Sequence, residues 1–127
     1  MKTIYLCGPI NGCTDEECND WRRLVQTIAP WNEYINPMRR DYRGVEGDND
    51  ADIVEFDKVD VTNSDVVLVS YDKPSVGTSM EVLYGWERGK LIVVVHQEGA
   101  VLSPWLTYHS HRRFTSYYDA LDWIQTQ

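Results

Sequence analysis

The sequence has 127 residues, 43% of them hydrophobic, which fits one domain with one packed core over residues 1–127 and excludes two ordinary domains. Its net charge of −8 argues against duplex DNA or an anionic membrane as the main partner, since both require a basic surface. No apolar run approaches the length of a membrane span and no signal-peptide pattern is present, so we expect a cytoplasmic protein.

The first predicted element is a buried strand at residues 2–7, KTIYLC, which stops at the turn-forming sequence GPING. A cap at Thr14 or Asp15 and an apolar stripe then predict a helix that ends at Pro30. The next expected elements are a short strand at 33–37 and a long polar loop at 38–52.

A second helix is predicted at 51–63 and a strand, buried on both faces, at 65–71. The apolar residues of this helix that we expect to face the core are Ile53, Val54, Phe56 and Val59. The remaining expected elements are a loop and helix ending near Gly89, a buried strand at 91–96, an irregular stretch at 97–111, a short strand near 112–116 and a final helix at 117–125.

Strands alternate with helices along the chain, and the central strands are uniformly apolar. This pattern predicts an α/β protein with an open parallel sheet and helices on both faces. In such sheets, ligands bind beyond the carboxyl ends of the strands. We therefore look for a functional site in the loops that lie at that edge, which are 8–14, 36–50, 71–78 and 96–104.

The segment SVGTSME, residues 75–81, connects the strand at 65–71 to the next helix and has two interpretations. In the structural one, Thr78 and Glu81 form a capping box that satisfies free amides at the helix start, and the motif alone favours this. In the functional one, Glu81 lies in the first turn, where the helix dipole keeps it ionised, and the small-residue loop lets a substrate approach. An ionised carboxylate there is a candidate nucleophile.

Asp57 and Asp60 lie on the predicted helix at 51–63. Asp57 can project toward the same edge as Glu81, and two carboxylates facing one pocket are suited to cleaving a glycosidic bond. One of them attacks the anomeric carbon, while the other donates a proton to the leaving group or accepts one from the incoming group. From spacing alone, a solvent-exposed helix face is the more common role for both aspartates.

The cysteines are Cys7, Cys13 and Cys18, and their odd number favours reduced thiols. No C-x-x-C spacing supports a metal site, and no other metal-binding motif is evident. We therefore expect neither a metal nor a cofactor.

Three pieces of the sequence, in order, resemble the nucleoside 2-deoxyribosyltransferases and the related 2′-deoxynucleoside 5′-monophosphate N-glycosidases. They are KTIYL with Tyr5, DKVDVTNSDVVLVSY with Asp57, and PSVGTSMEVLYGWERGK with Glu81. The resemblance runs from KTIYLCGPI to about Trp105 and implies a flavodoxin-like sheet of about five strands. It also implies that Glu81 attacks C1′ of a deoxyribose, that Asp57 assists departure of the base, and that Tyr5 orients the glutamate.

The two branches of this family differ at the 5′ end of the sugar. Transferases typically hold the 5′-hydroxyl with an aspartate six residues before the nucleophile, whereas this sequence has Ser75, which resembles the phosphate-binding serine of the hydrolases. The hydrolases also usually carry an arginine in the first loop, and GPINGCTD has none. A cation would have to come from elsewhere, and arginines such as Arg39, Arg40 and Arg43 are more often surface residues.

The resemblance further implies a deoxynucleoside or deoxynucleotide and a nucleobase as small-molecule partners. The segment VLSPW, which contains Ser103, resembles a segment that family members insert into the active site of a neighbouring chain. The resemblance therefore implies a homodimer or larger homo-oligomer with shared sites. The substrate-binding residues expected on this basis are Gly8, Ile10, Asn11, Ser75, Gly77, Met80 and Ser103.

Transfer of the deoxyribosyl group between bases is the first expectation, and hydrolysis of 5′-monophosphates is the main alternative. An NAD-type glycohydrolase also uses a glutamate on a related sheet, but Asp57 and Tyr5 favour the deoxyribosyl interpretation. A non-enzymatic flavodoxin-like module is the remaining alternative. A phospho-receiver requires an acidic cluster after the first strand, and CGPING has none.

Overall fold

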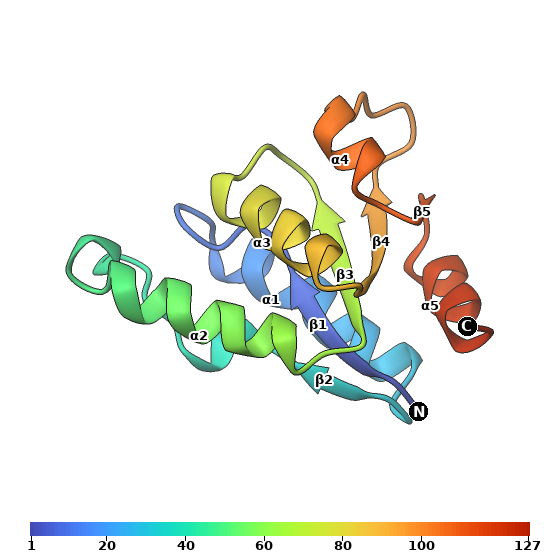
Figure 1. Cartoon of the computed structure of the whole chain (residues 1–127), viewed down its shortest axis with the longest axis horizontal. Coiled ribbons are helices and arrows are strands. Elements are labelled where there is room, and N and C mark those ends of the chain that lie inside the picture. Colours follow the sequence, from blue (N-terminus) through green and yellow to red (C-terminus); the bar gives the residue numbers. More distant parts are fainter.

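A five-stranded, all-parallel sheet in the order β2-β1-β3-β4-β5 forms the centre of the computed structural model, which describes all 127 residues (Figure 1). The predicted α/β fold is thereby confirmed. The strands are β1 (Thr3–Cys7), β2 (Glu33–Ile35), β3 (Val66–Tyr71), β4 (Leu91–His96) and β5 (Arg112–Phe114).

Helices cover both faces of the sheet, as the sequence predicts. They are α1 (Asp15–Ile28), α2 (Asp50–Thr62), α3 (Val76–Glu87), α4 (Pro104–Tyr108) and α5 (Tyr117–Gln125). Residues of α1 and α5 pack on one face, and residues of α2, α3 and α4 pack on the other. In Figure 1, α2 and α3 lie side by side in front of the sheet, and α4 lies beyond the tips of β3 and β4.

The central strands contribute side chains to both cores, which explains their uninterrupted apolar sequences. In β3, Val66 and Leu68 belong to the α1–α5 core, while Val67 and Val69 belong to the α2–α3 core. All four side chains are almost completely buried. A strand enclosed on both faces needs apolar residues at every position, so alternation is absent.

Local signals in the sequence set the ends of several elements. Thr14 and Glu17 form a capping box at the start of α1, and Gly89 follows α3 with a φ of 73°. Gly8, directly after β1, has no room for a side chain, since a Cβ there would lie 3.0 Å from Trp21 Cζ2 and 3.3 Å from the Ser70 carbonyl oxygen. This close packing fixes where the first loop leaves the sheet.

Two predictions about local structure are wrong. Residues 104–108, expected to be irregular, form α4, and the expected loop at 38–52 contains two short 3₁₀ turns, Pro37–Arg39 and Glu46–Asp48. The first turn of α4 has features that permit it, because Pro104 follows an N-cap serine, Ser103, whose hydroxyl accepts from the Trp105 amide.

The orientation predicted for α2 is also wrong. Val54, Phe56 and Val59 are 47%, 44% and 54% exposed, and Ile53 is half-buried rather than a core residue. Val61 and Asp60 are the buried residues of this helix. The sequence of α2 has little amphipathic contrast, so tertiary packing decides which side faces inward.

None of the helices combines the length and the apolar character that crossing a lipid bilayer would require. Cys7, Cys13 and Cys18 are unpaired and buried.

Candidate active site

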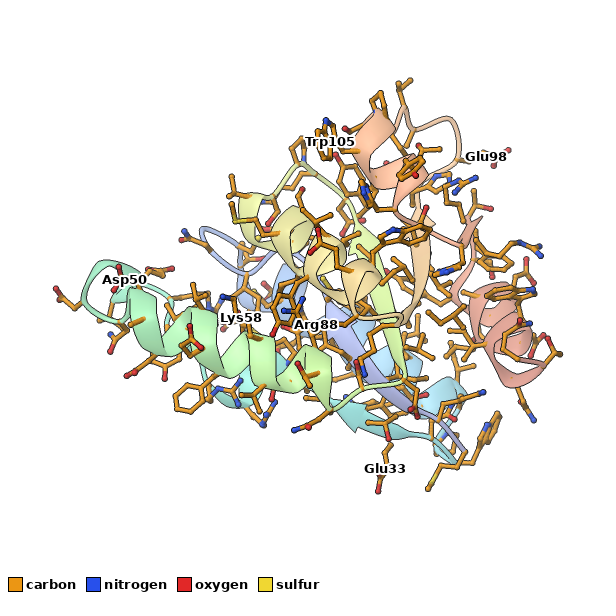
Figure 2. The ribbon with its side chains drawn as sticks, viewed as in Figure 1. Glu33, Asp50, Lys58, Arg88, Glu98 and Trp105 are labelled. Atoms are coloured by element: carbon orange, nitrogen blue, oxygen red, sulfur yellow. The ribbon has the colours of Figure 1, made fainter.

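A pocket of about 360 Å³ lies at the carboxyl edge of the sheet, where the sequence predicts a ligand site. The first loop and the N-terminal ends of α2 and α3 lie together there (Figure 1). Figure 2 shows Asp50 at the outer end of α2, on the rim of this region. The lining residues are Gly8, Ile10, Asn11, Pro37, Arg40, Tyr42, Arg43, Glu46, Asp50, Ile53, Val54, Asp57, Ser75, Val76, Gly77, Thr78 and Glu81.

Glu81 does not cap its helix. The N-cap of α3 is Ser75, whose hydroxyl accepts from the Thr78 amide, so Glu81 is the sixth helical residue and lies in the second turn. Both the capping-box interpretation and the first-turn placement are therefore wrong. Thr78 Oγ1 is instead buried with no hydrogen-bond partner. The dipole effect fades beyond the first turn, so other contacts must control the charge of Glu81.

Two side chains from β1 hold the carboxyl group of Glu81. Tyr5 donates its hydroxyl to Oε2 at 2.5 Å, and the Cys7 thiol lies 3.5 Å from Oε1. Tyr5 and Cys7 are both directed into the α2–α3 core, and each is at most 1% exposed. The sequence predicted the Tyr5 contact but missed Cys7, because a cysteine in a buried strand is usually an ordinary apolar residue.

Burial dominates the titration of these groups. It raises the pKa of Glu81 to about 8, helped by the negative charge of Asp57 and opposed by the hydrogen bonds from Tyr5 and Cys7. Burial also raises the pKa values of the Tyr5 hydroxyl and the Cys7 thiol well above their ordinary range, with Glu81 adding to both shifts. Tyr5 and Cys7 therefore stay protonated at neutral pH and act as donors.

Asp57 lines the same pocket from α2. Burial raises the pKa of Asp57 to about 6, the charge of Asp60 adds to the shift, and the charge of Arg40 opposes it. The site thus contains two carboxyl groups with raised pKa values, and this pair can hold one proton near neutral pH.

Asp60 is not on a solvent-exposed helix face, as spacing alone suggested. It is 5% exposed, and its two oxygens accept hydrogen bonds from Arg39 at 2.7 Å and Arg40 at 2.5 Å. The side chain of Asp57 is 28% exposed and forms part of the pocket lining. Residues 39 and 40 belong to the segment after β2, which no periodic pattern could connect to α2.

Arg22 of α1 supports the site from the other side of β1. Its side chain is completely buried, and its guanidinium donates to the carbonyl oxygens of Leu6, Gly8 and Cys18 at 2.6–3.2 Å. No carboxylate is paired with it, and its positive charge lowers the pKa of Glu81. These bonds also fix the carboxyl end of β1, which bears Cys7 and the first loop.

Arg43 joins the first loop to the segment after β2. Its guanidinium donates to the Cys13 carbonyl oxygen and to the carboxylates of Asp15 and Asp41 at 2.6–3.2 Å. Arg43 lines the pocket, but two acidic partners offset its charge. Arg43 therefore stabilises the pocket wall and is not a free cation for a ligand.

The structure brings together most of the predicted substrate-binding residues. Gly8, Ile10, Asn11, Ser75 and Gly77 line the pocket that holds Glu81 and Asp57. Met80 lines an adjoining hollow of about 280 Å³, which Glu81 and Asp57 also line.

Ser103 lies apart from this group. It lines a separate hollow of about 200 Å³ between α3 and α4, to which Met80 and Trp105 contribute but Glu81 does not. Figure 2 shows Trp105 on α4, on a different side of the molecule from Asp50. Within one chain, therefore, Ser103 does not share a pocket with Glu81.

Sequence reasoning did not assign the pocket residues from the segment after β2 and from the start of α2. Among them, Arg40, Tyr42, Glu46 and Asp50 carry polar groups that could contact a ligand. The polar character of residues 38–52 and their place at the ligand edge were the available signals. No group of three or more His, Cys, Asp or Glu side chains is arranged to hold a metal ion.

No family model matches the chain, and no curated protein matches it in sequence. Solved structures do match. A 2-deoxyribosyltransferase from Bacillus psychrosaccharolyticus has a TM-score of 0.75 at 16% identity, over 92% of this chain and 88% of that one. The chain shares the fold of a 2-deoxyribosyltransferase.

Two further structures extend this comparison. A conserved protein from Enterococcus faecalis V583 has a TM-score of 0.75 at 15% identity, over 99% of this chain and 98% of that one. A CMP N-glycosidase from Clostridium botulinum has a TM-score of 0.59 at 16% identity, over 98% and 97% of the two chains. The fold is therefore common to a 2-deoxyribosyltransferase and a nucleotide N-glycosidase. At these identities the likeness establishes the fold, and the chemistry has to be argued from the site.

Proposed function

We propose that the protein cleaves the N-glycosidic bond of 2′-deoxynucleosides and transfers the deoxyribosyl group to another nucleobase. One observation carries this proposal: Glu81, held by Tyr5 and Cys7, shares a pocket with a second carboxyl group, Asp57. A fixed carboxylate can form a covalent glycosyl-enzyme, and the neighbouring acid can protonate the departing base.

The reaction requires Glu81 as an anion and Asp57 as an acid. Because the pKa of Glu81 exceeds that of Asp57, a single shared proton rests mainly on Glu81 in the free protein. Substrate binding has to favour the form with the proton on Asp57. Glu81 then bonds to C1′ as the C1′–N bond breaks, the bonding electrons pass to the base, and the Asp57 proton neutralises it. A second base reverses these steps, with net retention at C1′.

The surroundings of the first loop favour an uncharged 5′ group. Two arginines contact this loop. Arg22 is completely buried and donates to backbone carbonyl oxygens, and Arg43 is already paired with Asp15 and Asp41. Lys73, in the loop between β3 and α3, is paired with Glu17. Next to the first loop, a substrate phosphate would therefore find no exposed cation without an acidic partner, whereas a hydroxyl needs only one polar partner.

The alternative function is hydrolysis of 2′-deoxynucleoside 5′-monophosphates. It draws support from the start of α3, where the Ser75 hydroxyl and the first amides of a 12-residue helix border the pocket. A helix N-terminus with a hydroxyl beside it is a suitable place for a phosphate. The two functions differ in the 5′ group and in the acceptor.

Product analysis separates these functions. We expect the purified protein to release free base from 2′-deoxynucleosides and, when a second base is added, to form the new β-deoxynucleoside in a chromatographic assay. Faster release from 5′-monophosphates, with no effect of an added base, would establish the alternative. NAD is offered in a parallel reaction to detect glycohydrolase activity. Absence of base release from all deoxynucleosides and monophosphates would exclude both functions.

We also propose a homo-oligomer in which Ser103 of one chain approaches the pocket of another. Ser103 does not share a pocket with Glu81 within its own chain, and exposed apolar side chains line its hollow: Met80 is 68% exposed and Trp105 71%. An exposed patch of large apolar residues next to a candidate site marks an interaction surface.

Sedimentation tests this assembly. We expect the wild-type protein to sediment as a dimer or larger species, and Trp105→Glu to shift it to a monomer with loss of base release. Tyr118→Glu is the control, because Tyr118 is also a large exposed aromatic residue, at 58% exposure, but lies on α5. An active wild-type monomer at assay concentration would contradict the proposal.

A further inference from the structure

Among the cations that line the candidate site, Arg40 has N–H groups that are not used in hydrogen bonds within the protein. Its Nη2 donates to Asp60 Oδ2 at 2.5 Å and lies 3.9 Å from Asp57 Oδ1. Its Nε and Nη1 have no partner in the protein, and neither nitrogen is sealed off from the pocket or solvent. The side chain is 22% exposed and lines the pocket with Asp57 and Glu81. Arg40 is thus anchored at one nitrogen and free to bind at two others.

The anchor also fixes where the guanidinium lies. Asp60 is buried and binds Arg40 through one oxygen, and the guanidinium carbon sits 4.9 Å from the centre of the Phe56 ring. An arginine held by a carboxylate and an aromatic ring presents its remaining N–H groups in a set direction. Such preorganised donors stabilise charge effectively because little rearrangement is needed during reaction.

We propose that Arg40 is a catalytic residue that donates a hydrogen bond to the departing nucleobase, at a ring oxygen or nitrogen on which negative charge develops. This inference rests on the proposed function. When the C1′–N bond breaks, its electron pair passes to the base, and charge spreads over the acceptor atoms of the ring. Asp57 supplies the proton, while Arg40 stabilises the charge before that proton arrives. The substrate class is therefore a nucleoside whose base carries an acceptor atom near the glycosidic nitrogen.

Arg39 provides a matched control. It donates to the other oxygen of Asp60 at 2.7 Å, so removing either arginine leaves Asp60 with one partner. Arg39 does not line the pocket, and 47% of its side chain is exposed. Arg39→Gln and Arg40→Gln should therefore lower the melting temperature by similar amounts, while only Arg40→Gln affects the departing base.

The experiment measures kcat for base release by these variants at the pH optimum of each. Substrates are paired by leaving-group ability: 2′-deoxyuridine with its 5-fluoro analogue, and 2′-deoxyadenosine with its 2-fluoro analogue. We expect Arg40→Gln to lose about 10- to 100-fold on the unsubstituted base, the range for a hydrogen bond to a charged group. The loss should be smaller on the fluorinated base, which bears negative charge more easily, and Arg40→Lys should recover part of it.

Equal losses for Arg40→Gln and Arg39→Gln, or equal losses on both members of a substrate pair, would overturn the role of Arg40 while leaving the proposed function intact. A loss seen only with 5′-monophosphates would also overturn it, because Arg40 would then contact phosphate. If the wild-type protein releases base from none of these substrates, the proposed function fails, and this inference fails with it.

Discussion

Glu81→Gln is expected to reduce base release by at least about a thousandfold, because an amide cannot form the glycosyl–enzyme bond. The substitution keeps the shape of the side chain and an oxygen that can accept the hydrogen bond from Tyr5. Chromatography of the released base measures the loss. Mass spectrometry of the protein adds a direct test, since the wild-type chain incubated with a deoxynucleoside should gain one deoxyribosyl unit and the variant should not.

The same variant is expected to be more stable than the wild type above neutral pH. The pKa of Glu81 is raised from 4.5 to about 8 by burial, so folding holds a proton that the unfolded chain releases between these values. Wild-type stability therefore falls as pH rises from about 4.5 to 8, on the order of a few kcal/mol. Glutamine has no such proton to hold. Melting temperatures of the two proteins should agree near pH 4 and differ by several degrees near pH 9.

These paired measurements separate chemistry from folding. A variant that is inactive and more stable at high pH has lost a nucleophile rather than its structure. Retained turnover by Glu81→Gln would remove Glu81 from the chemistry. Equal melting temperatures at pH 9 would mean that the carboxyl group is solvated, contrary to its half-buried position at the pocket wall in contact with Tyr5 and Cys7.

Asp57→Asn is expected to reduce kcat by about 10²- to 10⁴-fold on substrates with poor leaving groups, the range for general acid catalysis. The loss should be smaller on bases that leave readily as anions. In the wild type, kcat/KM should rise with pH through about 6 and fall through about 8, because the reactive pair of carboxyl groups holds one proton.

The variant should change the shape of this pH profile. Without Asp57, no acid remains to be lost at high pH, so the alkaline fall should disappear. Removing the negative charge of Asp57 should also lower the pKa of Glu81 from about 8. Because Glu81 must then lose its own proton before it reacts, the acidic rise should follow that pKa and lie between about 6 and about 8, at or above its wild-type position. A bell-shaped profile that survives in Asp57→Asn, or an equal loss for every base, would show that Asp57 binds substrate without transferring a proton.

The role that we propose for Arg40 could not be inferred from the sequence, since it depends on contacts across the fold. The segment after β2 folds back on α2, and Asp60 binds both Arg39 and Arg40. Spacing placed Asp60 on a solvent-exposed face because α2 has no clear apolar side. Burial of Asp60 and exposure of Val54 and Phe56 are consequences of packing that helical periodicity cannot predict.

The sequence by itself predicted the parallel sheet, the edge at which the pocket lies and, through the family resemblance, that Asp57 and Glu81 face one pocket. Uninterrupted apolar strands can only be stable between two layers of helices, and this arrangement sends the loops after the strands to one edge. Only the tertiary structure decided which groups Glu81 contacts there. The carboxyl group of Glu81 could either cap the helix or accept a hydrogen bond from Tyr5. Because α3 begins at Val76, Ser75 is the N-cap residue, and Glu81 accepts from Tyr5 instead. That choice turns Glu81 into the pocket, where burial and the neighbouring Asp57, rather than the helix dipole, set its charge.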